Sequence, residues 1–207
     1  MTRTTTRLVR LAGGLLIGAV VLAGCSDDNA GSNAASSSSA ESADEATAHN
    51  NADVTFVQGM IPHHQGALAM AQLADGRAQD PRVIDLAGRI EAAQDPEIET
   101  MTGWLETWGE PAPESMDMEG MDHSSGSMDM GSMSEEDMAT LEAASGAEFD
   151  RMFLEMMTEH HRGAVEMAQT EIADGSNQDA VELASNIVES QTAEIEEMQS
   201  LLSELGG

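Results

Sequence analysis

Two blocks of this sequence repeat each other at a constant offset of 97 residues. The block at 56–72 contains Met, two adjacent His, Gly-Ala and Met-Ala, and the block at 153–169 has the same residues in the same places. The same offset aligns 90–101 with 187–198, where Ile, Gln, Glu-Ile and Met recur. Because two separate segments match at one offset, we interpret the chain as a duplication of a two-element unit.

Each element has the apolar periodicity of a helix, and no stretch alternates as a strand does. Asp80 followed by proline is typical of a helix start. Ser145 and Ser176 each precede an acidic residue by three positions, which predicts two further N-caps. We place four helices at 53–74, 81–107, 147–173 and 178–205.

Two long helices joined by a short turn form a helical hairpin, and two hairpins form a four-helix bundle. The sequence therefore predicts an all-α, up-down-up-down bundle over 52–205. It consists of two duplicated hairpins, 53–107 and 147–205, which are joined by a crossover at 108–146.

The first 24 residues have the three-part build of a bacterial lipoprotein signal. Three arginines precede an apolar stretch at 11–21, and Leu-Ala-Gly-Cys ends at Cys25. We expect a signal peptide at 1–24 and a lipid on Cys25 that attaches the protein to the membrane, at the outer face of the cell membrane or in the periplasm. The alternative is an uncleaved anchor with an incidental cysteine, and both place the remainder outside the cytoplasm. The Ser/Ala-rich segment 25–51 predicts a disordered tether.

The charge of the exported part excludes one class of partner. Five arginines, no lysine and all 38 acidic residues follow the signal, which gives a formal charge of −33. Such a surface repels nucleic acid and anionic lipid and gathers cations nonspecifically. We therefore expect no nucleic-acid partner.

The inward face of the predicted helices carries polar residues where apolar ones are expected. On a helical wheel of about 100° per residue, each repeat places two His, one Gln and one Glu on this face. They are His63, His64, Gln94 and Glu97 in the first repeat, and His160, His161, Gln191 and Glu194 in the second. Such groups are costly to bury without partners. Two interpretations remain: a structural network of hydrogen bonds, or a metal site that the Gln and Glu support.

The residue types favour a soft or borderline metal. Imidazole binds copper, zinc, nickel and iron, whereas a thioether binds chiefly Cu(I). Met60 lies three and four residues before His63 and His64, and Met157 has the same relation to His160 and His161. Side chains at these spacings are neighbours on a helix. The spacing therefore predicts metal binding by both blocks.

The predicted crossover contains a second group of soft ligands. Among Gly, Ser, Asp and Glu it carries Met116, Met118, Met121, His123, Met128, Met130 and Met133. Methionine has no packing role in so polar a loop, which favours weaker sites for Cu(I) or Ag(I). The alternative is an acidic linker in which methionine is incidental. A short helix is expected after the loop, from Glu135 to Ala144.

The doubled block Met-x-x-His-His-x-Gly-Ala-x-x-Met-Ala, each copy followed by Gln-x-x-Glu-Ile, resembles the secreted bacterial family called domain of unknown function 305. The resemblance covers about 52–205 and implies a ferritin-like four-helix bundle. Some members are similar to periplasmic copper-binding proteins. The resemblance implies these metal ligands: Met60, His63, His64 and Met70, with Met157, His160, His161 and Met167. Pro96 departs from the family pattern, which leaves the local geometry of its helix open.

These observations favour a lipid-anchored, extracytoplasmic protein that binds a copper ion, as Cu(I) or Cu(II), and buffers or carries it in copper tolerance. Two alternatives stay open. One is a ferritin-like, metal-dependent oxidoreductase, and the other is a structural envelope lipoprotein without metal. We expect binding rather than catalysis, because no catalytic acid or base stands out beyond Glu97 and Glu194. The sequence does not identify a protein partner for metal transfer.

Overall fold

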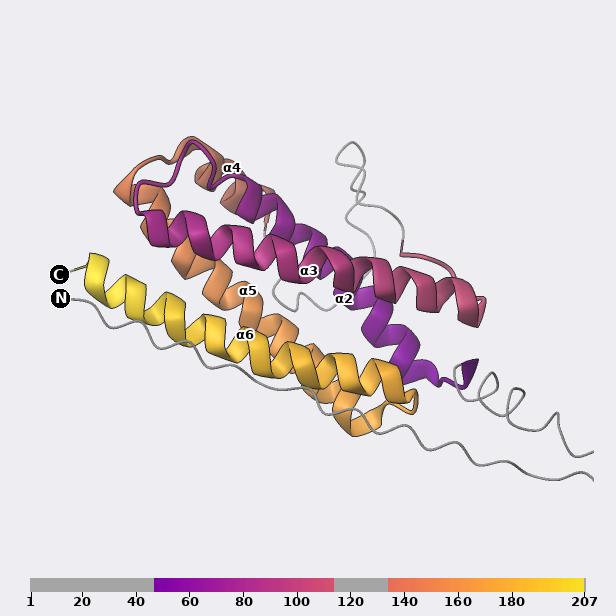
Figure 1. Ribbon diagram of the computed structural model, residues 1–207. Coiled ribbons are helices and arrows are strands. Elements are labelled where there is room, and N and C mark those ends of the chain that lie inside the picture. Colours follow the sequence, from indigo (N-terminus) through magenta and orange to yellow (C-terminus); the bar gives the residue numbers. More distant parts are fainter. Residues whose placement is uncertain (1–46, 114–133, 207) are drawn as a thin grey trace, which may run out of the picture. The chain divides into compact units, whose positions relative to one another are not determined.

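The computed structural model describes residues 47–113 and 134–206 (Figure 1). Its helices are α2 (Asn51–Gln72), α3 (Pro81–Trp108), α4 (Glu135–Ala143), α5 (Ala147–Asp174) and α6 (Gln178–Leu205). These ranges contain no strand, so the predicted all-α class is confirmed. Several predicted features lie outside the described residues: the signal, Cys25, and the loop residues Met116, Met118, Met121, His123, Met128, Met130 and Met133.

The helix starts are partly as predicted. The Asp80 side chain accepts a hydrogen bond from the backbone N–H of Arg82, as expected of an N-cap. The two capping boxes are wrong. Helix α5 follows Gly146, which has φ 64° and no side-chain cap, and α6 is capped by Asn177. The Ser176 hydroxyl is engaged elsewhere, because it donates to Asp53 at 3.0 Å.

The two hairpins pack side by side into one bundle. Helix α2 packs against α3, α5 packs against α6, and contacts between α2 and α5 join the hairpins. Salt bridges from Arg82 to Glu204 and from Arg89 to Glu197 link α3 to α6. They pair the start of α3 with the end of α6, so these two helices run antiparallel (Figure 1).

The core consists of two apolar clusters, one toward each end of the bundle. The first cluster includes Leu86, Phe149 and Phe153, and α4 adds Leu141 to it. The second includes Phe56 and Leu105. Most residues of one cluster are equivalent, at the repeat offset of 97 residues, to residues of the other cluster. A pseudo-twofold axis therefore passes through the middle of the bundle, where the predicted polar residues lie.

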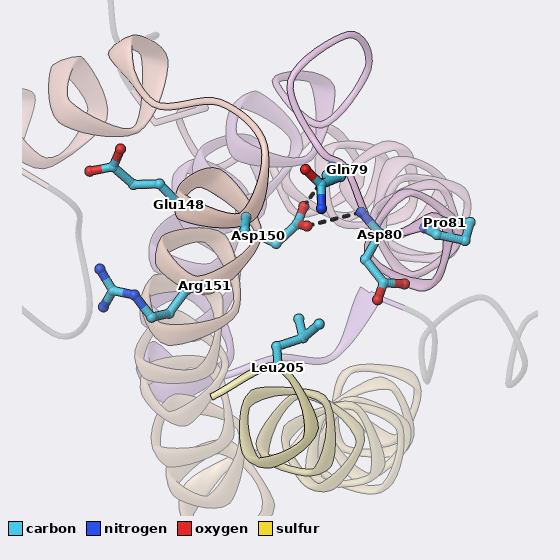
Figure 2. Close-up of a pocket in the computed structure, with 8 residues that line it drawn as sticks. Gln79, Asp80, Pro81, Glu148, Asp150, Arg151 and Leu205 are labelled. Atoms are coloured by element: carbon cyan, nitrogen blue, oxygen red, sulfur yellow. Dashed lines mark hydrogen bonds between the residues drawn. The ribbon is translucent and has the colours of Figure 1, made fainter. Parts of the chain in front are cut away.

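Two buried aspartates hold the hairpins together at opposite ends. Asp150 on α5 accepts the backbone N–H groups of Gln79 and Asp80, both at 2.9 Å, at the start of α3 (Figure 2). Asp53 on α2 accepts those of Ser176 and Asn177, at 3.0 and 2.9 Å, before α6. Each aspartate thus satisfies orphan donors at a helix start in the other repeat.

The helices of the described ranges are not membrane spans. None of them combines the length and the apolar character needed to cross a bilayer.

Candidate metal site

Four histidines form the centre of a polar layer between the two apolar clusters. Their exposed fractions are 8% for His63, 0% for His64, 3% for His160 and 0% for His161. The layer also contains Gln94 and Gln191, each 3% exposed, and the half-buried Glu97 and Glu194. The sequence-predicted polar set therefore faces the bundle interior.

The first histidines of the two blocks meet across the pseudo-twofold axis. The rings of His63 and His160 are stacked, with centroids 3.7 Å apart and planes at 20°. His160 Nε2 lies 2.8 Å from the carbonyl oxygen of His63, an atom that only accepts, so Nε2 carries the proton. A Cβ on Gly66 would lie 3.4 Å from His160 Cε1, so the absent side chain leaves room for this ring.

The second histidines pair instead with glutamates inside their own hairpins. His64 Nε2 is 2.7 Å from Glu97 Oε2, and His161 Nε2 is 2.8 Å from Glu194 Oε2. A carboxylate only accepts hydrogen bonds, so each imidazole donates from Nε2, and each Nδ1 is buried without a hydrogen-bond partner. A carboxylate on the far nitrogen is the arrangement that orients many metal-bound histidines.

His63 is a neutral imidazole. Burial, followed by repulsion between like charges from His160, His64 and His161, lowers the pKa of His63 from 6.5 to about 2. Neutral imidazole is the form that binds a metal ion.

The layer also concentrates unsatisfied polar atoms. Among the described residues, nine buried side-chain N or O atoms have no hydrogen-bond partner, and six of them lie in this layer. The six are His63 Nδ1, His63 Nε2, His64 Nδ1, His161 Nδ1, Gln94 Oε1 and Gln191 Oε1. An unsatisfied buried polar atom costs about 1–3 kcal/mol. So many in one layer make it a candidate site for a ligand such as a metal ion or for ordered water.

The four methionines of the two blocks form one pair near the stacked histidines and one pair farther from them. Met60, Met157 and Met70 are fully buried in the apolar clusters, and Met167 is half-buried. Met60 and Met157 lie one helical turn before the stacked histidines. Met70 and Met167 lie seven residues after the stacked histidines, roughly 10 Å along the helix. The sulfur of Met167 lies near α2, since a Cβ on Gly59 would be 3.6 Å from Met167 Sδ. The near pair is therefore better placed to bind beside the rings.

The side chains do not form a complete coordination shell. In 47–113 and 134–206, no three His, Cys, Asp or Glu side chains are grouped closely enough to hold one ion. The donor chemistry nonetheless fits a soft or borderline metal, because four of the six unsatisfied atoms in the layer are imidazole nitrogens. Binding then requires rotation of side chains within the layer.

A separate buried carboxylate lies at one end of the bundle and was not expected from the sequence. Glu171 is 1% exposed, and burial together with the neighbouring Asp53 raises its pKa to about 8. The repeat offset would have identified Asp53 and Asp150 as equivalent positions. It could not have identified Glu171, because the equivalent residue is Ala74.

The surface pocket in Figure 2 lies away from the polar layer. It is lined by Gln79, Asp80, Pro81, Ala147, Glu148, Asp150, Arg151 and Leu205. None of the four buried histidines lines it, so it does not contribute to the candidate metal site.

The fold and the site define a class of protein: a four-helix bundle of duplicated hairpins with a histidine layer at its centre. The model of the family DUF305, domain of unknown function, matches residues 53–202. The chain belongs to this family, as its doubled block predicted. No match was found among curated proteins.

Solved structures of this family share the fold. A DUF305 protein of Streptomyces coelicolor, assigned as secreted, is 34% identical over 75% of this chain and 94% of its own, with a TM-score of 0.66. A DUF305 fragment from Deinococcus radiodurans is 32% identical, over 75% and 97%, with a TM-score of 0.65. CopM in its Cu(II)-bound form is 33% identical, over 73% and 96%, with a TM-score of 0.62. CopM has also been solved with Cu(I) and with Ag.

Proposed function

We propose that this protein binds copper outside the cytoplasm as a lipid-anchored lipoprotein, and that it buffers or carries the metal in copper tolerance. The observation that carries the proposal is the layer of four buried histidines, three of which have ring nitrogens without a hydrogen-bond partner. The Cu(II)-, Cu(I)- and Ag-bound forms of CopM, at about 30% identity, support this choice of metal.

The bundle offers ligands for both oxidation states. The imidazoles of His63, His64, His160 and His161 suit Cu(II), and the thioethers of Met60 and Met157 suit Cu(I). The methionines of the crossover and His123 would add weaker sites, because the Gly, Ser and Asp residues between them predict a high cost of ordering this segment on binding. Cu(I) and Ag(I) should therefore use both regions, and Cu(II) chiefly the bundle.

The sequence and one relative support the proposed location outside the cytoplasm. The n-region, the apolar stretch and Leu-Ala-Gly-Cys predict export and a lipid on Cys25. The relative from Streptomyces coelicolor is assigned as secreted, which supports an extracytoplasmic location. A copper site outside the cytoplasm suits the absence of any cysteine after Cys25 in the sequence.

The test is a titration of four proteins with Cu(II), Cu(I) and Ag(I). They are the wild type, the variant with His63, His64, His160 and His161 replaced by Ala, a loop variant with the six crossover Met and His123 replaced by Ser, and His49→Ala. His49 is a matched control, because it precedes α2 and stacks on Trp108, the last residue of α3, and is not one of the four histidines of the layer.

The four-histidine variant should lose Cu(II) binding, and the loop variant should lose part of its Cu(I) capacity. Copper should raise the melting temperature of the wild type, because it binds the folded state. Full Cu(II) affinity in the four-histidine variant would refute the site. Rapid turnover in Cu(I) or peroxide oxidation would instead favour an oxidoreductase.

A further inference from the structure

We propose that the bundle holds one metal centre shared by both repeats and formed by one histidine of each block, not one centre in each repeat. The stacked pair, His63 and His160, is its core. This inference rests on the proposed function and defines the composition of that same site.

Adjacent residues on a helix cannot easily bind the same ion. Their side chains project about 100° apart, so neighbours in sequence do not face each other. The structure shows this separation: His63 stacks on His160 of α5, whereas His64 bonds to Glu97 of α3. The second block divides in the same way, since His161 bonds to Glu194 of α6. A two-histidine chelate must therefore combine residues from different helices.

A close contact between two histidines crosses the repeat boundary. The ring centroids of His63 and His160 are 3.7 Å apart, and His160 Nε2 reaches the His63 backbone at 2.8 Å. One histidine of each repeat therefore lies at the pseudo-twofold axis.

The two halves of this centre are not equivalent. His160 Nε2 is engaged by the His63 carbonyl, whereas both ring nitrogens of His63 are buried without a partner. The residues before them also differ, with Pro62 in the first block and the exposed Glu159 in the second. Because the lone pairs of stacked rings do not point at one ion, a chelate would require rotation of the rings and release of the His63 carbonyl by His160.

The test measures the Cu(II) stoichiometry of the loop variant, in which only the bundle binds. One shared centre predicts one tightly bound Cu(II) per chain, and two independent centres predict two. The electron paramagnetic resonance spectrum should show a single copper species with nitrogen ligands and no coupling between copper ions. This measurement needs no change in the bundle itself.

Variants confined to one repeat give the second readout. His63→Ala with His64→Ala, and His160→Ala with His161→Ala, should each weaken the single Cu(II) site by more than about 100-fold. If either variant instead keeps one site of unchanged affinity while the stoichiometry falls from two to one, the shared centre is refuted and copper binding stands. Absence of any Cu(II) binding by the unaltered bundle would overturn both proposals.

Two controls test whether the variants fold and which pair of histidines binds the metal. Circular dichroism of each metal-free variant should show the wild-type helix content. His64→Ala with His161→Ala removes two histidines but leaves the stacked pair, so it should bind Cu(II) more tightly than His63→Ala with His160→Ala. The reverse order would overturn the assignment of the stacked pair as the core.

Discussion

Asp53 and Asp150 occupy the same position in the two repeats, and each accepts two backbone N–H groups from the turn of the other repeat. Both side chains are buried, at 0% and 1% exposure. The duplication therefore produced more than two hairpins that pack together. Each hairpin supplies a side chain that the other needs to begin its second helix.

Replacement of Asp150 by Ala should destabilise the bundle by about 2 kcal/mol, because two part-buried backbone N–H donors lose their carboxylate acceptor. Urea unfolding followed by circular dichroism measures this change. Asp95→Ala is the control: Asp95 is exposed in the middle of α3, so its loss should change the stability by no more than about 0.5 kcal/mol. Similar effects of the two substitutions would show that the Asp150 cap contributes nothing.

The stability of the protein should fall as the pH rises from about 5 to 8. The pKa of Glu171 is raised from 4.5 to about 8 in the folded protein, so the native state holds a proton that the unfolded chain has already lost. The stabilisation is complete below pH 4.5 and is lost as the pH passes 8. Between these pH values the free energy of unfolding falls by up to about 1.4 kcal/mol per pH unit.

The variant Glu171→Gln isolates this effect, because its amide stays neutral at every pH. The difference in unfolding free energy between the variant and the wild type should grow in favour of the variant between pH 5 and pH 8. Urea unfolding at each pH measures it. The exposed Glu166→Gln is the control and should give a constant difference. Parallel curves for Glu171→Gln and the wild type would show that Glu171 ionises normally.

The sequence predicted the repeat, the helices and the polar face, because these follow from local periodicity and a constant offset. It could not predict which histidine faces which helix. A helical wheel places His63 and His64 on one broad face, and only packing separates them toward α5 and α3. The capping boxes at Ser145 and Ser176 were wrong for a related reason. A cap depends on tertiary partners as well as local spacing, and Ser176 is bound by the distant Asp53.

Glu97 is predicted to be a positioning residue for the metal. It holds the proton of His64 on Nε2, so Glu97→Gln should lower Cu(II) affinity about 10- to 100-fold while helix content is unchanged. Copper titration of the loop variant measures the affinity. Glu99→Gln, an exposed change two residues away on the same helix, should leave it unaltered. Equal affinities in the two variants would assign the His64–Glu97 pair a purely structural role.

Gly66 sets the space in which His160 approaches His63. A Cβ at this position would be in ordinary contact with the ring, 3.4 Å from Cε1 and 3.7 Å from Nε2. Gly66→Ala should therefore fold normally and gain up to about 1 kcal/mol from helix propensity. Gly66→Leu should displace the His160 ring, destabilise the bundle and lower Cu(II) affinity at least tenfold. Gly88→Leu is the matched control, since a Cβ there meets nothing within 4 Å. Thermal unfolding and copper titration of the three variants check both effects. If Gly66→Leu binds copper as tightly as Gly88→Leu, the position of His160 against His63 does not matter for the metal.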